Sequence, residues 1–567
     1  MTFTPTSLQG NFLITLNRVG DGRGWFMRTY SKEEFEEIGH TQEWLQMNHS
    51  FTAEKGTVRG MHFQNPPSSE VKLVRCVRGK VWDVAVDLRK GSSTYLKWFA
   101  AELSENNDRM MYIPEGFAHG FQALDDNAEL VYMHTNVYTP AAESGLRFDD
   151  PVLNIQWPLA AKNISDRDRS HVFIDLVNSP ASNSFLTKEQ LNEPEVYYPL
   201  KVFLCHNCFL VQVDEYKKSD DIFNAEYVYF SSFSKSWLKH AQEYVEMMIQ
   251  RFGLNEKSLV MEVASNDGYL LQYLQERNVP VLGIEPTRNT AAVAEKKGIE
   301  TITEFFGVNL ATQLAGQGKH ANLLLGNNVL AHVPDILDFV GGMKIVLKPE
   351  GVITMEFPHL LRLVQSNQFD TIYHEHFSYL SFYTVRLIFE KCGLKMFDVE
   401  ELSTHGGSLR IFACHEESDR IPDARVEEML LKEERAGMQT LEFYNGFQDR
   451  AMKVKLDLLR FLVEQKSKGK TVAGYGAAAK GNTLLNFCGV KNDLLDFVVD
   501  ANPNKQGKYL PASHIPVVDE ALLKSKKPAY VILLPWNLKD ELMHQLKYIR
   551  EWGGKFVIPI PDLTIID

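Results

Sequence analysis

The first 170 residues consist of short runs in which hydrophobic and polar positions alternate, separated by turn residues. The segments 80–93 and 109–121 show this alternation most clearly. A period of two residues is typical of strands that bury one face only. The pattern therefore predicts an all-β domain, a sandwich or a barrel, over residues 1–170.

From about residue 240 the pattern changes. Apolar runs at 259–264, 281–285, 322–328 and 351–357 are separated by segments whose hydrophobic residues recur at helical spacing. Buried strands that alternate with helices are typical of a parallel, doubly wound sheet.

A third pattern begins after residue 415 with a charged helical stretch over about 424–469. A second α/β unit follows, with strand candidates at 471–476, 496–500, 530–535 and 555–560. We expect a multidomain chain: a β-barrel or jelly roll, a Rossmann-like α/β domain and a C-terminal α/β domain. The expected divisions are 1–170, 171–240, 241–415 and 416–567.

Length and composition agree with several domains that act on a small molecule. A chain of 567 residues exceeds one core, since domains usually hold roughly 100 to 200 residues. The net charge of −13, with both signs interspersed, argues against nucleic-acid binding. Six scattered cysteines, no leader-like start and no long apolar run predict a cytoplasmic protein without a membrane span.

The first region carries residues suited to proton transfer at a carbon beside a ketone. This chemistry needs a base, a group that stabilises the enolate oxygen, and an acid. His62 in RGMHFQ is the candidate base, with Asp168 as its orienting carboxylate, Lys72 is the enolate partner and Tyr132 is the acid. A lone histidine in a strand is more often structural, so the wider pattern decides.

That wider pattern comprises, in chain order, DGRGWF, QMNHS, GTVRGMHFQ, the segment 71–95, YIPEGFAHGF and the segments 138–145 and 148–158. Together they resemble the dTDP-4-dehydrorhamnose 3,5-epimerase family, which implies a cupin-like barrel, a homodimer and the four catalytic roles just given. The resemblance also implies contacts to the substrate from Arg23, Phe26, Gln46, Asn48, Arg59, His119 and Tyr138. Arg28 stands where many members carry an acidic residue, which leaves the sugar and the epimerised carbon open.

The second region carries a nucleotide-binding pattern. LVMEVASNDGYLL at 259–271 is a strand, a turn of small residues and a helix, and Glu285 ends the next strand 18 residues past Asp267. An acidic residue there favours ribose hydroxyls, as in sites for S-adenosylmethionine or NAD. The candidate cofactor-binding residues are Glu262, Ala264, Ser265, Asn266, Asp267, Gly268, Glu285, Asn327 and Asn328.

Further motifs separate these two cofactors. The segments 179–212 and 226–237, GNNVLAHVPD, FDTIYHEHFSYLS, THGGSLR and GYGAAAKGNTLL occur in order and resemble the sugar C-methyltransferases of deoxysugar pathways. The resemblance implies S-adenosylmethionine, a dTDP-4-keto-6-deoxyhexose and His376 as the base. It places Tyr227, His332, Tyr373 and Glu375 around the sugar, and Lys480 and Asn482 at the diphosphate.

The sequence offers two candidate metal sites. His374 and His376 with Glu375 have no third partner nearby in sequence, so we favour catalysis over a metal there. Cys205 and Cys208 form one CxxC pair, whereas a structural zinc site needs four ligands. The similar methyltransferases carry an earlier pair that this chain lacks. We expect an empty zinc site, with His206, His171 or a distant residue as the alternative ligands.

The sequence thus predicts a bifunctional enzyme that epimerises a dTDP-4-keto-6-deoxyhexose at C3, C5 or both, and C-methylates it at C3. One alternative is a methyltransferase whose front domain only dimerises or binds substrate. The other is a nucleotide-sugar sensor on a biosynthetic scaffold. C3 against C5 specificity, stereochemistry, the nucleotide and the final sugar stay open.

Overall fold

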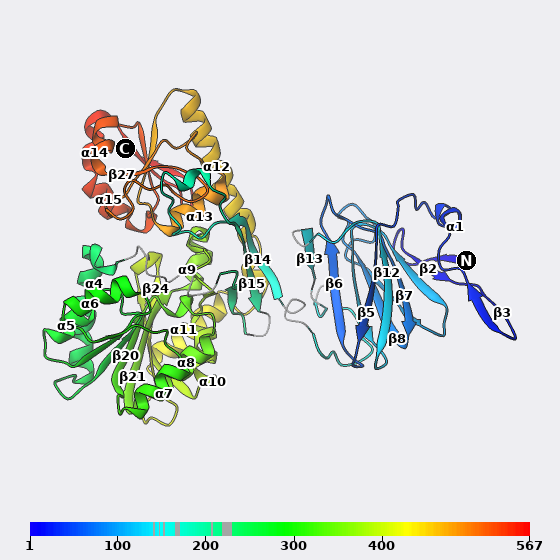
Figure 1. Cartoon of the computed structure of the whole chain (residues 1–567), viewed down its shortest axis with the longest axis horizontal. Coiled ribbons are helices and arrows are strands. Elements are labelled where there is room, and N and C mark those ends of the chain that lie inside the picture. Colours follow the sequence, from blue (N-terminus) through cyan, green and yellow to red (C-terminus); the bar gives the residue numbers. More distant parts are fainter. Residues whose placement is uncertain (140–141, 147, 151–152, 165–169, 206–207, 218–229) are drawn as a thin grey trace. The chain divides into compact units, whose positions relative to one another are not determined.

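The computed structural model describes residues 1–139, 142–146, 148–150, 153–164, 170–205, 208–217 and 230–567 (Figure 1). The chain forms two compact units, Met1–His171 and Val172–Asp567. We call them the N-terminal and C-terminal units and describe each by itself.

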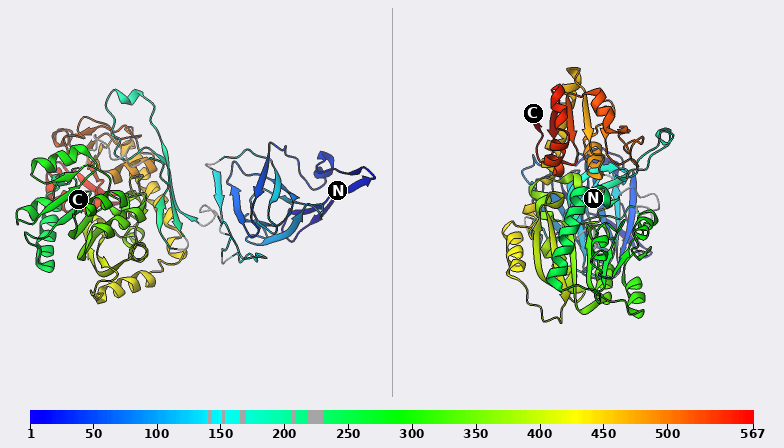
Figure 2. Two further views of the ribbon diagram at one scale, coloured as in Figure 1. Left: turned by 60° about the horizontal axis from the view of Figure 1, so that its bottom comes forward. Right: turned by 90° about the vertical axis from the view of Figure 1, so that its left-hand side faces the viewer.

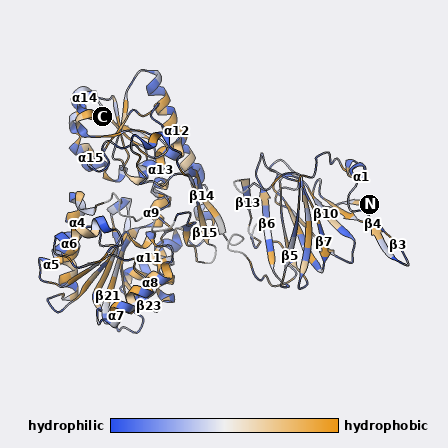
Figure 3. Ribbon diagram, viewed as in Figure 1, coloured by the Kyte–Doolittle hydropathy of each residue, from blue (hydrophilic) through white to orange (hydrophobic). Residues whose placement is uncertain are grey.

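The N-terminal unit is a jelly roll of two antiparallel sheets. One sheet has the order β1-β2-β10-β7-β12-β5 and the other β13-β6-β11-β8-β9. Hydrophobic and polar residues alternate along the strands (Figure 3), so one face of each sheet is apolar and packs in a shared core. The strands are β1 Thr2–Pro5, β2 Phe12–Thr15, β5 Gln46–Thr52, β6 Val58–Gln64, β7 Lys72–Arg78, β8 Lys80–Asp87, β9 Trp98–Ser104, β10 Arg109–Ile113, β11 Phe117–Ala123, β12 Ala128–His134 and β13 Glu143–Gly145. A separate hairpin joins β3 (Arg18–Asp21) to β4 (Gly24–Met27), and α1 covers Lys32–Glu36.

The first α/β part of the C-terminal unit is a seven-stranded sheet of order β19-β18-β17-β20-β21-β24-β23. Its strands are β17 Val260–Val263, β18 Val281–Ile284, β19 Thr301–Ile302, β20 Ala321–Asn327, β21 Leu347–Pro358, β23 Leu394–Leu402 and β24 Ser408–His415. The helices are α4 Lys235–Phe252, α5 Leu271–Gln275, α6 Arg288–Lys296, α7 Val308–Gly316, α8 Ile336–Val346, α9 Leu360–Gln365 and α10 Phe382–Lys391.

Helices cover both faces of this sheet (Figures 1 and 2) because successive strand residues point to opposite sides. Leu323 and Leu325 of β20 pack in one core cluster with α4 and α5, whereas Leu324 packs in another with α7 and α8. A strand buried on both faces is a continuous apolar run, which explains the sequence pattern.

The second α/β part has a six-stranded sheet of order β27-β26-β25-β28-β29-β30. Its elements are β25 Val472–Tyr475, α13 Ala479–Cys488, β26 Val498–Val499, β27 Val517–Val518, α14 Glu520–Lys526, β28 Tyr530–Leu533, α15 Lys539–Gln545, β29 Lys555–Ile558 and β30 Thr564–Ile566. The charged helical stretch before it divides into α11 (Ala424–Arg435) and α12 (Phe447–Ser467). Gly437 and Gly446 interrupt it, with φ of 84° and 74°.

A small sheet, β14-β15-β16-β22, completes the unit. Its strands are β14 Ser170–Ser179, β15 Tyr198–Cys205, β16 Val211–Val213 and β22 Ser378–Tyr379. Its buried residues belong to the same core cluster as α12 and the second α/β sheet. The jelly roll followed by two α/β parts confirms the predicted fold class.

Candidate functional site

Four of the predicted residues meet in the N-terminal unit where its two sheets face each other. His62 on β6 lies opposite His119 on β11 in the strand register. Lys72 begins β7 and donates from Nζ to the backbone oxygen of His62 at 3.3 Å. The rings of His119 and Tyr132 lie 6.1 Å apart. The fold therefore gathers the candidate base, enolate partner and acid.

The protonation states suit proton donation by Tyr132. Its hydroxyl pairs with Ser50 Oγ at 2.8 Å, and burial raises the pKa of Tyr132, which keeps the phenol protonated. Nearby, His119 Nε2 lies 2.7 Å from Asp83 Oδ1, and both side chains are buried. This pair fixes the ring of His119. The sequence prediction missed Asp83, which follows Trp82 in an ordinary strand pattern.

Glu70 is a second residue that the sequence prediction missed. Its Oε1 lies 3.2 Å from Lys72 Nζ, and its Oε2 lies 2.9 Å from His134 Nδ1. Burial favours the neutral acid, but the hydrogen bond from His134 and the charge of Lys72 hold the pKa of Glu70 below its usual value. An ionised carboxylate therefore stands beside the candidate enolate partner.

Several predicted substrate contacts line one edge of the unit. Gln46 Nε2 donates to Asn48 Oδ1 at 3.0 Å, and Gln46 Oε1 accepts from the backbone N–H of Tyr138 at 3.0 Å. Arg59 donates to the backbone oxygen of Phe51 at 3.3 Å. These contacts tie strands β5 and β6 to the segment after β12.

Arg23 and Phe26 stand apart from these residues, on the β3–β4 hairpin. Arg23 pairs with Asp21, and Phe26 is 69% exposed. Arg28, the residue that departs from the family pattern, forms an ion pair in which its Nη1 lies 3.5 Å from Glu34 Oε1. Asp168, the predicted partner of His62, lies outside the described residues.

The C-terminal unit holds a cavity of about 590 Å³ where the carboxyl ends of its two α/β sheets meet. In open α/β sheets, ligands bind beyond the carboxyl ends of the parallel strands, where the strand order reverses. The lining includes ten predicted residues: Ala264, Asn266, Glu285, Asn327, Asn328, His332, Tyr373, Glu375, His376 and Lys480. The remaining predicted residues Glu262, Ser265, Asp267, Gly268 and Asn482 are not among its lining residues, and Tyr227 lies outside the described residues.

One side of the cavity fits the methyl donor. The buried Glu285 carboxylate accepts hydrogen bonds at 2.9 Å from the backbone N–H groups of Asn266 and Thr287. A carboxylate at the end of the second strand is suited to ribose hydroxyls. Gly268 has φ of 71°, and a Cβ there would lie 2.4 Å from Ile299 Cδ1, so only glycine fits this turn. These residues would hold S-adenosylmethionine.

His376 lies on the other side, in a tautomer suited to a base. Its Nδ1 lies 3.0 Å from the backbone oxygen of Thr371, which can only accept, so Nδ1 carries the hydrogen and Nε2 the lone pair. Burial and the neighbouring His332 hold the pKa of His376 well below its usual value. The ring centres of Tyr373 and His332 lie 4.1 and 4.6 Å from that of His376.

Glu375 adds a carboxyl group with a displaced pKa. Burial raises the pKa of Glu375 to about 7, although the side-chain amide of Asn183 donates to both carboxyl oxygens at 2.8 and 3.0 Å. Asn183 lies 192 residues earlier in the chain, and the prediction missed it. Its segment, 179–212, carried part of the family resemblance.

His405 is another cavity residue that the prediction missed, although it belongs to the THGGSLR motif. It sits in a tight turn, Thr404–Gly406, with φ of 55°, and burial lowers its pKa to about 4. Its ring meets the edge of Trp237 with 5.1 Å between centres, and Trp237 stacks on His240 at 4.9 Å. Both His405 and Trp237 line the cavity.

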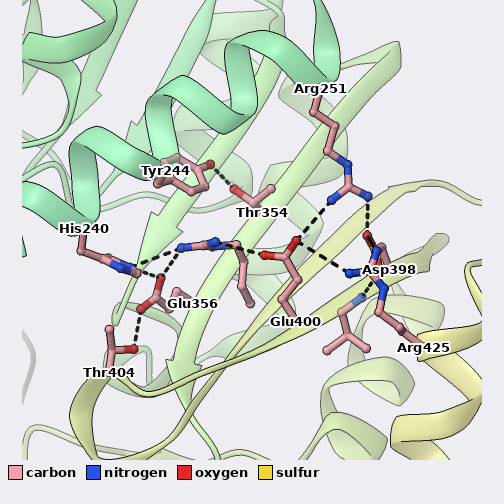
Figure 4. A network of polar contacts seen from close by, with 11 residues as sticks. His240, Tyr244, Arg251, Thr354, Glu356, Asp398, Glu400, Thr404 and Arg425 are labelled. Carbon is pink, nitrogen blue, oxygen red and sulfur yellow. Dashed lines mark hydrogen bonds and ion pairs between the residues drawn. The ribbon is translucent and has the colours of Figure 1, made fainter.

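A buried network of charges anchors this turn (Figure 4). The Glu356 carboxylate accepts from Thr404 Oγ1 at 2.9 Å, from His240 at 2.9 Å and from Arg410 at 3.2 Å. Burial alone favours the neutral acid, but these partners hold the pKa of Glu356 below its usual value. Beyond Arg410 the network continues through Glu400 and Asp398 to Arg251 and Arg425.

Two lysines of the second α/β part line the cavity, Lys480 at the start of α13 and Lys505 in the segment between β26 and β27. Lys480 Nζ donates to Asn537 Oδ1 at 2.7 Å, and Lys505 Nζ donates to the backbone oxygen of Ala477 at 2.8 Å. Asn482 instead donates to the backbone oxygen of Ser182 at 2.6 Å and is buried. Asn482 thus fastens α13 to the segment that carries Asn183, and its contact to a substrate stays a prediction.

The CxxC pair does not fit a zinc centre in the described part of the chain. Among those residues no group of three or more His, Cys, Asp or Glu side chains is placed to hold a metal. A hydrogen bond with Cys205, together with burial, raises the pKa of the Cys208 thiol. Leu204 and Val211 beside the pair are fully buried in the large core cluster, so this hairpin has apolar packing of its own. His206 lies outside the described residues.

Within the described ranges, no helix combines the length and apolar character that a bilayer crossing requires.

Four family models match the chain. They are described as dTDP-4-dehydrorhamnose 3,5-epimerase over residues 5–175, putative zinc binding domain over 163–223, methyltransferase domain over 237–399, and C-methyltransferase C-terminal domain over 403–561. These matches confirm both resemblances that the sequence motifs indicated.

Two curated relatives give the same division. The C-methyltransferase NovU of Streptomyces niveus is 35% identical over 397 residues, 70% of this chain and 94% of the relative. The dTDP-4-dehydrorhamnose 3,5-epimerase of Shigella flexneri is 47% identical over 177 residues, 31% of this chain and 97% of the relative. A crystal structure of the corresponding epimerase from Elizabethkingia anophelis is 37% identical and covers 30% of this chain and 93% of that one, with a TM-score of 0.29.

Proposed function

Because the chain belongs to the dTDP-4-dehydrorhamnose 3,5-epimerase family at its N-terminal end and to a C-methyltransferase family over the remainder, we propose that it is a bifunctional enzyme. It epimerises a dTDP-4-keto-6-deoxyhexose and transfers a methyl group to a carbon of the same sugar. One observation carries this proposal. The chain holds two separate sets of groups for removing a proton beside a ketone, one around His62 and Lys72 and one around His376.

In the first set, His62 removes the proton and the Lys72 ammonium stabilises the enolate oxygen. The buried, protonated Tyr132 returns a proton to the opposite face of the carbon, which inverts its configuration. Asp168 is proposed to orient His62, as the family resemblance implies.

In the second set, the lone pair on His376 Nε2 removes the proton from the carbon that receives the methyl group. S-adenosylmethionine, held by Glu285 and the turn at Asn266, would supply that methyl group from its sulfonium. Neutral His332 and Tyr373 pack against His376 and limit the positions that its ring can adopt.

The chemistry fixes the order of events if both act at C3. A C3 that carries carbon, oxygen and a new methyl group has no hydrogen left to remove, so epimerisation at C3 must come before methylation there. Epimerisation at C5 has no such constraint.

We further propose that the enzyme is a homodimer through its N-terminal unit. Three large side chains of the β3–β4 hairpin, Val19, Trp25 and Phe26, are 69%, 56% and 69% exposed. Apolar groups gathered on one hairpin are typical of an interface. A second copy that covers this hairpin would also receive Arg23, which accounts for its position apart from His62.

The test is to incubate the enzyme with a dTDP-4-keto-6-deoxyglucose in deuterium oxide, with and without S-adenosylmethionine. Mass and proton spectra then follow the sugar. We expect deuterium at C3, C5 or both without the methyl donor, and a product heavier by one methyl group with it.

Two variants separate the halves. His62→Asn should abolish the epimerisation and spare methylation of a sugar that already has the correct configuration, whereas His376→Ala should do the reverse. Exchange that is the same in wild type and His62→Asn would reduce the N-terminal unit to a scaffold, and the absence of a methylated product would remove the transferase.

A further inference from the structure

Among the described residues, no group has yet been assigned to the enolate oxygen of the second proton-transfer set. Removing a proton beside a ketone places a negative charge on oxygen, and a preorganised cation or donor there supplies much of the rate enhancement. In the N-terminal unit Lys72 fills this role. Burial lowers the pKa values of His332 and His376, so neither ring supplies a positive charge in the C-terminal cavity, and Glu375 is an acid rather than a cation.

Lys480 is the cation that the cavity places near His376. It lines the cavity together with His376 and His405, and its charge acts on both imidazoles. The only hydrogen bond described for its ammonium group is the one to Asn537. An ammonium has three donors, so two are available to a ligand in the cavity.

The surroundings hold Lys480 in place. Its Nζ lies 4.9 Å from the ring centre of Trp536, and the Trp536 indole donates to Asp370 Oδ2 at 2.7 Å. The same ring packs against the turn that carries His405, since a Cβ on Gly406 would lie 2.8 Å from it. Trp536 therefore ties Lys480 to the His405 turn.

Asp370 is the carboxylate that favours the charged form of the Lys480 ammonium. Burial lowers the pKa of Lys480, and the buried Asp370 carboxylate opposes that effect. The second oxygen of Asp370 has no hydrogen-bond partner in the described residues. In the N-terminal unit the proposed enolate lysine, Lys72, also has a carboxylate beside it, in a direct ion pair with Glu70 at 3.2 Å, whereas the effect of Asp370 on Lys480 is electrostatic.

We propose that Lys480 binds the ketone oxygen of the sugar and stabilises the enolate of the methyl-transfer reaction, rather than the diphosphate. This inference rests on the proposed function. His376 takes the proton, the C–H electron pair becomes the C=C bond, and the carbonyl π pair moves to the oxygen beside Lys480. The C=O bond then re-forms as the carbon bonds to the methyl group, whose former bonding pair stays on sulfur. Lys505, whose Nζ donates to the backbone oxygen of Ala477, is then the lysine that binds the diphosphate.

The experiment compares Lys480→Met, Lys480→Arg and Lys505→Met with Lys491→Met, an exposed lysine of the same domain that does not line the cavity. It measures kcat for methyl transfer and the Kd of dTDP, which has the diphosphate but no sugar. Binding of S-adenosylhomocysteine shows that each variant is folded.

We expect Lys480→Met to lower kcat by roughly 100- to 1000-fold and to leave the Kd of dTDP within about threefold of the wild-type value. Lys480→Arg keeps the charge and should retain more activity than Lys480→Met when both variants bind S-adenosylhomocysteine as the wild type does. Lys505→Met should weaken dTDP instead.

A Lys480→Met enzyme that binds dTDP tenfold or more weakly, but keeps kcat at saturation, would assign Lys480 to the diphosphate and overturn the inference. Equal kcat for Lys480→Met and wild type would overturn it as well. A wild-type enzyme that transfers no methyl group would instead refute the proposed function and, with it, this role.

Discussion

Replacement of Glu285 by glutamine tests the cofactor side of the cavity most directly. The carboxylate accepts from the backbone N–H groups of Asn266 and Thr287, both at 2.9 Å, and also from the Thr287 hydroxyl. In Glu285→Gln one oxygen becomes an NH₂ group, which must face either a backbone donor or the ribose hydroxyl it should accept from. The charge is lost at the same time.

The magnitude follows from these contacts. A hydrogen bond to a charged group contributes about 1.5–3 kcal/mol, and each 1.4 kcal/mol is tenfold in affinity. The variant should therefore bind S-adenosylhomocysteine roughly 10- to 100-fold more weakly. Leaving one buried N–H without an acceptor should also cost about 1–3 kcal/mol of folding free energy.

Titration calorimetry with S-adenosylhomocysteine measures the first effect and urea denaturation the second. Glu295→Gln, on the exposed face of α6, is the matched control and should change neither value. If Glu285→Gln bound the ligand within threefold of wild type, the ribose would have to lie elsewhere in the cavity, and our placement of the cofactor would be wrong.

Three other predictions concern buried carboxylates. Glu70→Ala should slow deuterium exchange into the sugar without S-adenosylmethionine roughly 10- to 100-fold, because Lys72 loses the partner that orients it. Glu70→Gln should slow this exchange less. Exchange at the wild-type rate in Glu70→Ala would contradict this role. For Glu375, whose pKa rises to about 7 from 4.5 on folding, the stabilising effect of protonation is full below about pH 4.5 and is lost as the pH rises through about 7. The free energy of unfolding of the wild type, measured by denaturation at each pH, should therefore fall by about 3 kcal/mol over this interval relative to that of Glu375→Gln. If the two free energies changed with pH in parallel, the pKa shift would be refuted. Glu356→Gln should destabilise the fold by about 3 kcal/mol in urea because it removes the buried negative charge that pairs with Arg410 and His240 and leaves the buried Arg410 with Glu400 alone. Glu401→Gln, which changes a half-exposed carboxylate, should cost less than about 1 kcal/mol.

The sequence by itself determined the fold classes and the centre of each site. The period-two alternation of residues 1–170 and the apolar runs from 259 onward depend only on which strand faces are buried, so they are visible locally. Strand ends and turns are local too, which is why Glu285 and the turn at 264–268 were found. The histidines within YHEHF and RGMHFQ were found because their motifs are contiguous.

Only the tertiary structure decided which groups stand beside these residues. Glu70 lies two residues before Lys72, which begins β7, so their contact is local in sequence. The pairing of Glu70 with His134, in contrast, depends on how β7 and β12 are aligned. Asn183 reaches Glu375 from 192 positions away, and Lys480 shares a cavity with His376 although the two belong to different α/β parts. Periodicity and turn chemistry report burial and direction along the chain. They contain no information on which loops of two sheets converge, because that is set by the packing of whole elements.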